Sequence, residues 1–217
     1  MSARGVATPV AMERAAVRCD IDVVAIGASA GGVTALPIVL STLAADFPAA
    51  VMIVLHLNPH HRSYLSSVLA RTCRLPVREA ESGVVMQSGI VYVAPRAVHL
   101  VLRGGALLLT DTPLVHFVRP SIDVLFGSVA AACGPHGVGV ILTGSGIDGA
   151  AGLEAIKRAG GRTIVQEPAS AEHSGMPSAA YATGCADFSL PLTRIGPALA
   201  DLVPTPRSSL LESGRDG

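Results

Sequence analysis

The feature that most constrains the fold is a set of short runs that are apolar at nearly every position. Such runs occupy residues 22–27, 51–56 and 137–143. A strand with one solvent-exposed face alternates apolar and polar residues. Runs that are apolar throughout therefore predict strands that are buried on both faces. Patterns of helical length lie between these runs. The sequence therefore predicts a three-layer α/β/α fold around a mainly parallel, doubly wound (Rossmann-like) sheet.

The remaining elements follow the same alternation. Further strands are predicted at 89–93, 162–166 and 187–190, and helices at 32–43, 63–72, 121–133, 150–159, 177–183 and 192–202. Residues 98–103 and 106–110 flank Gly104-Gly105, a turn typical of a β-hairpin. We expect this antiparallel hairpin at one edge of the sheet. Residues 1–20 and 204–217 are predicted to be flexible tails around one folded domain, residues 21–203.

Composition excludes several classes of protein. Lys and Arg together number 16, as do Asp and Glu, so no basic surplus exists to neutralise nucleic-acid phosphates. The apolar runs are far shorter than the ~20 residues of a membrane-spanning helix, and the N-terminus lacks the apolar core of a signal peptide. The four cysteines form no C-x-x-C pair, which argues against a zinc or redox motif. We expect a cytoplasmic protein without membrane insertion and without a nucleic-acid partner.

Three polar residues lie at the ends of predicted strands. Ser29 follows the first apolar run, His56 ends the second, and Asp148 follows the run that ends at residue 143. In open parallel sheets, ligands bind beyond the carboxyl ends of the strands. We therefore expect these side chains to lie at one edge of the sheet, where they could form a site.

Ser29 lies in a G-x-S-x-G motif, residues 27–31, between a predicted strand and a predicted helix. In that context a sharp turn exposes the serine hydroxyl as a nucleophile, and the N–H groups of the following helix can bind an oxyanion. A glycine-rich turn before a helix can equally bind a phosphate or serve close packing. The motif alone leaves an esterase, a phosphate site and a packing turn open.

His56 and Asp148 could complete a catalytic site with Ser29. A histidine beside a serine can act as its general base, and a carboxylate can orient the imidazole. Each has a simpler alternative: His56 as a surface residue, and Asp148 as the N-cap of the helix that begins near Gly149. His60 and His61 raise the question of a metal site, but their spacing fits no zinc motif and we predict none.

The loop Gly144–Gly149 offers a competing interpretation, because G-S-G-I-D-G matches the dinucleotide-binding pattern G-x-G-x-x-G. The loop follows a predicted strand, precedes a helix, and has Glu167 at roughly the expected distance. The charge of Asp148 would, however, repel a pyrophosphate. A nucleotide-binding oxidoreductase is thus the alternative function at this point.

Six blocks of sequence, in order, resemble the catalytic domain of chemotaxis protein-glutamate methylesterases (CheB-type). The resemblance runs from about Val23 to Leu199, and its blocks are V-V-A-I-G-A-S-A-G-G, L-H-L-N-P-H-H, V-Y-V-A-P, F-V-R-P-S-I-D-V-L-F, I-L-T-G-S-G-I-D-G-A-A-G-L and Q-E-P-A-S-A-E-H-S-G-M-P. Six ordered blocks are far more specific than any one motif.

The resemblance implies a catalytic triad of Ser29, His56 and Asp148, without a metal or cofactor. It implies an oxyanion site near Ala30 and Gly31 and in the Ser145 loop. The implied substrate is a methyl-esterified glutamate on the cytoplasmic helices of a chemoreceptor, with deamidation of receptor glutamines as a second reaction. Because receptor methylation regions are acidic, Arg119 is a candidate substrate contact.

The chain departs from the family pattern in three places. Many members carry Met where Ser145 stands and Thr where Ala30 stands; both changes keep the backbone N–H groups. The family commonly places a phosphorylated receiver domain before the esterase, for which the residues ahead of the first strand are too few. A chain that begins at Met1 suggests a stand-alone esterase, regulated by a separate response regulator or adaptor. A non-catalytic receptor-binding paralogue is the remaining alternative.

Overall fold

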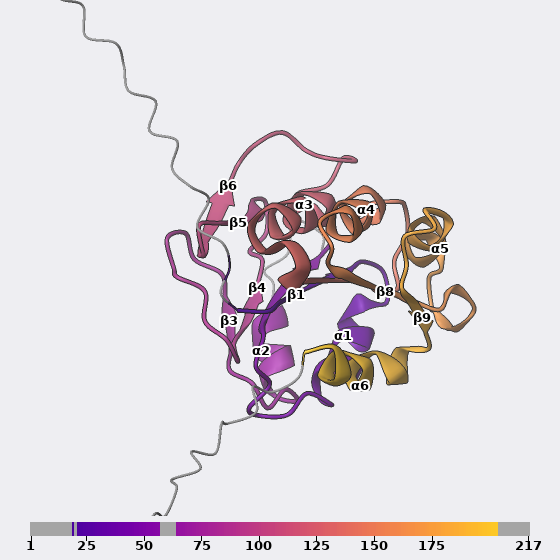
Figure 1. Cartoon of the computed structure of the whole chain (residues 1–217), viewed down its shortest axis with the longest axis horizontal. Coiled ribbons are helices and arrows are strands. Elements are labelled where there is room, and N and C mark those ends of the chain that lie inside the picture. The colour runs from indigo at the N-terminus through magenta and orange to yellow at the C-terminus, as the bar shows by residue number, and fades with distance from the viewer. Residues whose placement is uncertain (1–18, 20, 57–63, 204–217) are drawn as a thin grey trace, which may run out of the picture.

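The apolar runs form the middle of a seven-stranded sheet with the order β3-β4-β2-β1-β7-β8-β9 (Figure 1). Its strands are β1 (Val23–Ala28), β2 (Ala50–Leu55), β3 (Val77–Glu79), β4 (Val91–Val93), β7 (Gly137–Ile141), β8 (Arg162–Gln166) and β9 (Phe188–Leu190). Every pair of neighbouring strands in this sheet is parallel. The prediction of a mainly parallel, doubly wound α/β sheet is therefore confirmed.

The computed structural model describes residue 19 and residues 21–56 and 64–203. The expected tails, residues 204–217 and all of 1–20 but Cys19, lie outside the described residues, and so do His60 and His61. Within the described ranges, no helix is both long and apolar enough to span a membrane.

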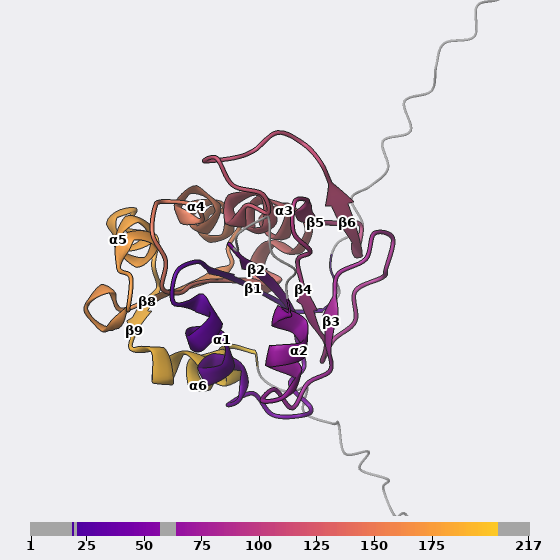
Figure 2. The ribbon, with the colours of Figure 1, turned by 180° about the vertical axis from the view of Figure 1, so that it is seen from behind.

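Helices cover both faces of the sheet, as Figures 1 and 2 show from opposite sides. One face carries α3 (Ile122–Cys133), α4 (Ala150–Arg158) and α5 (Gly175–Ala182), and the other carries α1 (Gly32–Leu40), α2 (Leu65–Ala70) and α6 (Leu192–Leu202). Alternate residues of β1 enter the two cores: Val23 and Ala25 pack below α3, whereas Val24 and Ile26 pack against α1. This two-sided burial is the reason that the strand sequences are apolar throughout.

The predicted antiparallel hairpin forms, and it is a small sheet of its own. Strands β5 (His99–Arg103) and β6 (Ala106–Thr110) make a separate two-stranded antiparallel sheet instead of extending the main sheet. Gly104 and Gly105 have positive φ angles of 57° and 76°, as a two-residue hairpin turn requires. The hairpin packs its leucines with α3 in one core, while the edge beside β4 is taken by β3, which the sequence analysis missed.

Element boundaries differ from the predictions by a few residues. Helix α1 ends at Leu40, α2 is shorter than predicted, and α5 begins at Gly175. Two short 3-10 helices, η1 (Gly134–His136) and η2 (Pro168–Ser170), were not predicted.

The order of the strands fixes where a site can form. From the central strand β1 the chain first moves to β2, on one side, and later returns on the other side of β1 through β7. This reversal of direction opens a crevice at the carboxyl ends of β1, β2 and β7. Ser29, His56 and Asp148 follow these three strands.

Candidate active site

Ser29 and His56 are neighbours across the two central strands. Ala28 pairs with Leu55 at the ends of β1 and β2, so the next residue of each strand, Ser29 and His56, emerges side by side. Adjacent strands are about 4.8 Å apart. The His56 N–H also donates to the Ala28 carbonyl at 3.1 Å. Among the described residues, no hydrogen bond joins the Ser29 hydroxyl to His56.

The turn after Ser29 has the tight geometry that its glycines allow. Gly31 has a φ of +78° and is the N-cap of α1. A Cβ atom on Gly32 would lie 2.4 Å from the Leu55 side chain and 2.8 Å from the Ala28 Cβ atom, so this position favours glycine. The Ser29 N–H donates to the Thr143 carbonyl at 3.0 Å, which ties the turn to the chain leaving β7.

Three N–H groups near this turn are free to bind an anion. Within the part of the chain that the structure describes, the N–H groups of Ala30, Gly31 and Ser145 donate no hydrogen bond. The Thr143 hydroxyl donates to the Ala30 carbonyl at 3.0 Å and so fixes the peptide between Ala30 and Gly31. Because the N–H of a trans peptide points opposite to its carbonyl, this bond also fixes the direction of the Gly31 N–H.

The His56 imidazole is paired with Asp148. Its Nε2 lies 2.9 Å from Asp148 Oδ2, and the two side chains are 13% and 4% exposed. An ionised carboxylate only accepts hydrogen bonds, so Nε2 carries the proton of this bond. The Nδ1 atom of a neutral His56 is then the unprotonated, basic nitrogen.

Asp148 is further held by the N-terminus of α3. Its carboxylate accepts hydrogen bonds from the Ser121 hydroxyl at 2.8 Å, the Ile122 N–H at 2.7 Å and the Asp123 N–H at 3.1 Å. Burial raises the pKa of Asp148, but the bonds from His56 and from α3 outweigh burial and bring its pKa below the usual range. Asp148 therefore remains ionised, as a group that stabilises an imidazolium must.

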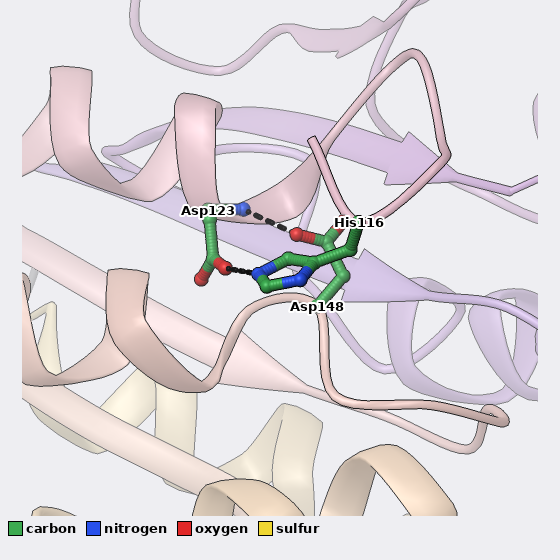
Figure 3. Close-up of side chains that lie close together, drawn as sticks. All are labelled: His116, Asp123 and Asp148. Atoms are coloured by element: carbon green, nitrogen blue, oxygen red, sulfur yellow. Dashed lines mark hydrogen bonds and ion pairs between the residues drawn. The ribbon is translucent and has the colours of Figure 1, made fainter. Parts of the chain in front are cut away.

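The N-terminus of α4 is capped by Asp123 and not, as the alternative reading of Asp148 had it, by Asp148. Asp123 Oδ1 accepts from the N–H groups of Gly149 at 3.0 Å and Gly152 at 2.6 Å. The side chain of Asp148 points to α3 instead (Figure 3). A dinucleotide pyrophosphate would need these N–H groups of α4, and a carboxylate already occupies them. The geometry is therefore unfavourable to the oxidoreductase alternative.

His116, Asp123 and Asp148 lie close enough for their ligand atoms to be within 4.8 Å of one another (Figure 3). Burial and the charge of Asp148 raise the pKa of Asp123, against the bonds from α4 and the pairing with His116. His116 Nε2 is 3.1 Å from Asp123 Oδ2. The carboxylate oxygens face N–H donors and histidine, so the cluster serves as a pair of helix caps and lacks the free ligand atoms of a metal site.

Arg119 lines the same cavity as His56, but its guanidinium is bound within its own loop. Its Nη1 donates to the carbonyls of Asp111 at 2.7 Å and Thr112 at 3.0 Å. Arg119 and His56 both line a cavity of about 260 Å³. Within the described residues, the buried Nε of Arg119 has no hydrogen-bond partner.

Sequence reasoning missed three residues that hold the site: Ser121, Asp123 and Thr143. The S-I-D sequence at the start of α3 was a usable signal, because Ser and Asp are frequent in the first turn of a helix. No local pattern indicates that Asp123 caps a different helix, 26 residues away at Gly149. Thr143 gave no signal beyond its place at the end of a strand.

Comparison with known proteins assigns the family. The CheB methylesterase family model matches residues 24–199. A protein-glutamate methylesterase/protein-glutamine glutaminase of Anaeromyxobacter dehalogenans is 42% identical over 196 residues, 88% of this chain and 55% of that protein. One of Burkholderia lata is 47% identical over 184 residues, 84% of this chain and 54% of that protein. The chain thus spans about half the length of these curated relatives.

A solved structure shares the fold. The catalytic domain of the Thermotoga maritima CheB methylesterase superposes with a TM-score of 0.81 at 33% sequence identity. The match covers 85% of this chain and 100% of that domain. Because the family model covers most of the sequence and the architecture agrees, this chain belongs to the CheB methylesterase family.

Proposed function

We propose that this chain hydrolyses methyl esters of glutamate side chains, with Ser29, His56 and Asp148 as its catalytic triad. The observation that carries the proposal is the buried His56–Asp148 hydrogen bond of 2.9 Å, next to the serine that follows the neighbouring strand β1. A base that is oriented by an ionised carboxylate and adjacent to a serine is the arrangement that activates a hydroxyl nucleophile.

The first chemical step is acyl transfer to Ser29. As Ser29 Oγ attacks the ester carbonyl carbon, His56 Nδ1 takes its proton, and Asp148 stabilises the imidazolium through Nε2. The carbonyl oxygen becomes an oxyanion, for which the N–H groups of Ala30, Gly31 and Ser145 are the candidate donors. His56 then gives the proton to the departing methoxide, so methanol leaves and an acyl-enzyme remains.

The second step reverses these roles with water. His56 takes a proton from water as the oxygen attacks the acyl carbon, and returns it to Ser29 Oγ as the ester bond breaks. The products are free glutamate and the original enzyme. A glutamine amide would follow the same course with ammonia as the leaving group, in line with the glutaminase in the names of the relatives. Neither step uses a metal or cofactor.

The substrate that we propose is a methylated glutamate on the cytoplasmic helices of a chemoreceptor, which places the reaction in the cytoplasm. The partner that controls the activity is, in this proposal, a separate response regulator or adaptor. Arg119 is retained as a substrate contact, since it lines the same cavity as His56.

Methanol release from membranes that contain methylated receptor tests the proposal. We expect Ser29→Ala to lower turnover by about three or more orders of magnitude, because triad residues act as a unit. Ser41→Ala, which changes an exposed serine at the end of α1, is the matched control and should retain full activity. Methanol release by Ser29→Ala at the wild-type rate would refute the assignment. Binding to receptor membranes without methanol release by the wild type would favour the non-catalytic alternative.

A further inference from the structure

A tight turn at residues 115–118 holds two residues in an unfavourable backbone conformation. Val115 and Val118 exchange N–H to carbonyl hydrogen bonds of 3.2 and 2.9 Å, and His116 and Phe117 between them have φ angles of 49° and 64°. Both angles lie in the left-handed region, where Gly and Asn are favoured and a bulky side chain is strained. Strained residues persist where the surrounding structure holds them, and they cluster at active sites and ligand-binding surfaces.

The side chain of Phe117 is 95% exposed, more than any other large apolar side chain of the described residues. Leu114, three residues earlier, is 56% exposed. The segment joining β6 to α3, which carries both, arches outward above α3 (Figures 1 and 2). The strained turn therefore presents an aromatic ring to solvent, which does nothing for the stability of the isolated chain.

Three anchors hold the turn in place. His116 Nε2 contacts Asp123 Oδ2 at 3.1 Å, which joins the turn to the caps of α3 and α4 (Figure 3). The Arg119 guanidinium binds the carbonyls of Asp111 and Thr112, across the base of the segment. The buried His99 accepts the Ser121 N–H at Nδ1, so its Nε2 carries the proton and donates to the Pro113 carbonyl at 3.1 Å. Phe117 is thus presented on a fixed support.

The turn and His56 share one cavity. The cavity of about 260 Å³ is lined by His56, by Ala97 and by residues 114 and 117–120 of the segment that carries the turn. Pockets for small molecules typically measure about 300–1,000 Å³, so this one suits a single side chain rather than a cofactor. Arg119 brings a positive charge to its wall, together with a buried Nε donor that lacks an acceptor within the described residues.

We propose that the turn at residues 115–118 is the docking surface for the helical segment that carries the esterified glutamate, with Phe117 as its apolar anchor. This inference rests on the proposed function. The occupant is inferred from the cavity: since His56 forms part of its wall, a side chain that His56 helps to hydrolyse would enter it. An apolar anchor beside a cation matches an amphipathic helix with acidic residues next to the ester.

The test compares a receptor substrate with a small ester. Phe117→Ala should lower kcat/KM for methylated receptor membranes by about tenfold to a hundredfold, as loss of an interface anchor does. Hydrolysis of a small soluble ester, N-acetylglutamate γ-methyl ester, should fall much less, because that ester lacks the helical surface that Phe117 is proposed to contact. Tyr181→Ala is the matched control, because it also removes an exposed aromatic ring. Tyr181 is 56% exposed and lies in the last turn of α5, at the opposite end of that helix from the turn that faces Gly144. It should change neither rate.

A second variant separates docking from misfolding. Phe117→Gly removes the ring but favours the positive φ, so it should lose receptor activity without lowering the thermal midpoint. Equal loss on both substrates, or no loss on either, would overturn the docking proposal.

Co-sedimentation with receptor membranes distinguishes failure of docking from failure of the proposed function. Ser29→Ala should bind methylated membranes, and Ser29→Ala combined with Phe117→Ala should bind them at least about tenfold more weakly. Binding that depends on Phe117 but comes without ester hydrolysis by the wild type would refute the function and retain the docking surface. Binding that is equally strong with and without the Phe117 side chain would refute the docking surface even if the enzyme is active.

Discussion

Asp123 and Asp148 each cap the helix next to the other. Asp123 lies in the first turn of α3 and accepts N–H bonds from the start of α4, whereas Asp148 precedes α4 and accepts N–H bonds from the start of α3. A negative charge at a helix N-terminus is stabilised by the free N–H groups and by the helix dipole. These hydrogen bonds join α3 to α4 and hold the Asp148 carboxylate in its position facing His56.

The pKa of Asp148 is lowered in this arrangement and the pKa of Asp123 is raised, which gives a prediction for Asp123. Its pKa is raised, so its ionised form is less stable in the folded chain than in the unfolded one at neutral pH. Asp123→Asn keeps an oxygen for the N–H groups of Gly149 and Gly152 and removes the repulsion with Asp148. We expect this variant to be at least as stable as the wild type at pH 7, by urea unfolding.

Asp123→Ala provides the contrast. It loses the acceptor for both N–H groups of α4 and should lower the free energy of unfolding by about 1–2 kcal/mol. If Asn and Ala proved equally destabilising, the charge of Asp123 and not its hydrogen-bonding geometry would be what matters.

Ser121 is the subject of a second prediction, because its buried hydroxyl donates to Asp148 Oδ1 at 2.8 Å. A hydrogen bond to a charged group contributes about 1.5–3 kcal/mol. If that energy holds Asp148 in place against His56, Ser121→Ala should lower kcat about tenfold or more and leave KM nearly unchanged. Ser121→Thr keeps the hydroxyl and should restore kcat. A rise in KM alone would assign Ser121 to substrate binding instead.

The site residues at the strand ends could be predicted from the sequence, whereas the residues that hold them in place by hydrogen bonds could not. Ser29 and His56 were found because a parallel strand buried on both faces is a local apolar run, and the residue after it is then a candidate for the site. Asp123 and Asp148 meet only through the packing of α3 on α4, which no local pattern encodes. The turn at Gly104-Gly105 revealed the hairpin, but the choice between the sheet edge and α3 depends on tertiary packing. Strand β3 is three residues long, V-R-E, too short and polar to be recognised.

Thr143 supports the Ser29 turn and yields a third prediction. Its hydroxyl donates to the Ala30 carbonyl at 3.0 Å and accepts the His173 N–H at 2.9 Å. Thr143→Val preserves the shape of the side chain but leaves the Ala30 carbonyl and the His173 N–H without this partner. We expect the free energy of unfolding to fall by about 1–3 kcal/mol. Because the Gly31 N–H would lose its fixed direction, kcat should fall more than KM changes. Thr143→Ser should retain wild-type kcat, and an unaltered kcat in Thr143→Val would remove the Ala30–Gly31 peptide from the oxyanion site.

The lowered pKa of Asp148 predicts how stability depends on pH. An aspartate whose pKa is lower in the folded chain contributes stability that is fully present above its unfolded pKa of about 3.9, and loses it as the pH falls through the folded value. The contribution is about 1.4 kcal/mol for each pKa unit of lowering. Asp148→Asn lacks this contribution at every pH because asparagine does not ionise, and its amide N–H group would also face the N–H donors of α3. Urea unfolding should therefore find the variant less stable than the wild type at pH 7. This gap in the free energy of unfolding should become smaller as the pH falls below about 4. A gap that stays constant down to pH 3 would mean that the carboxylate charge contributes nothing, and that the variant suffers only from altered packing.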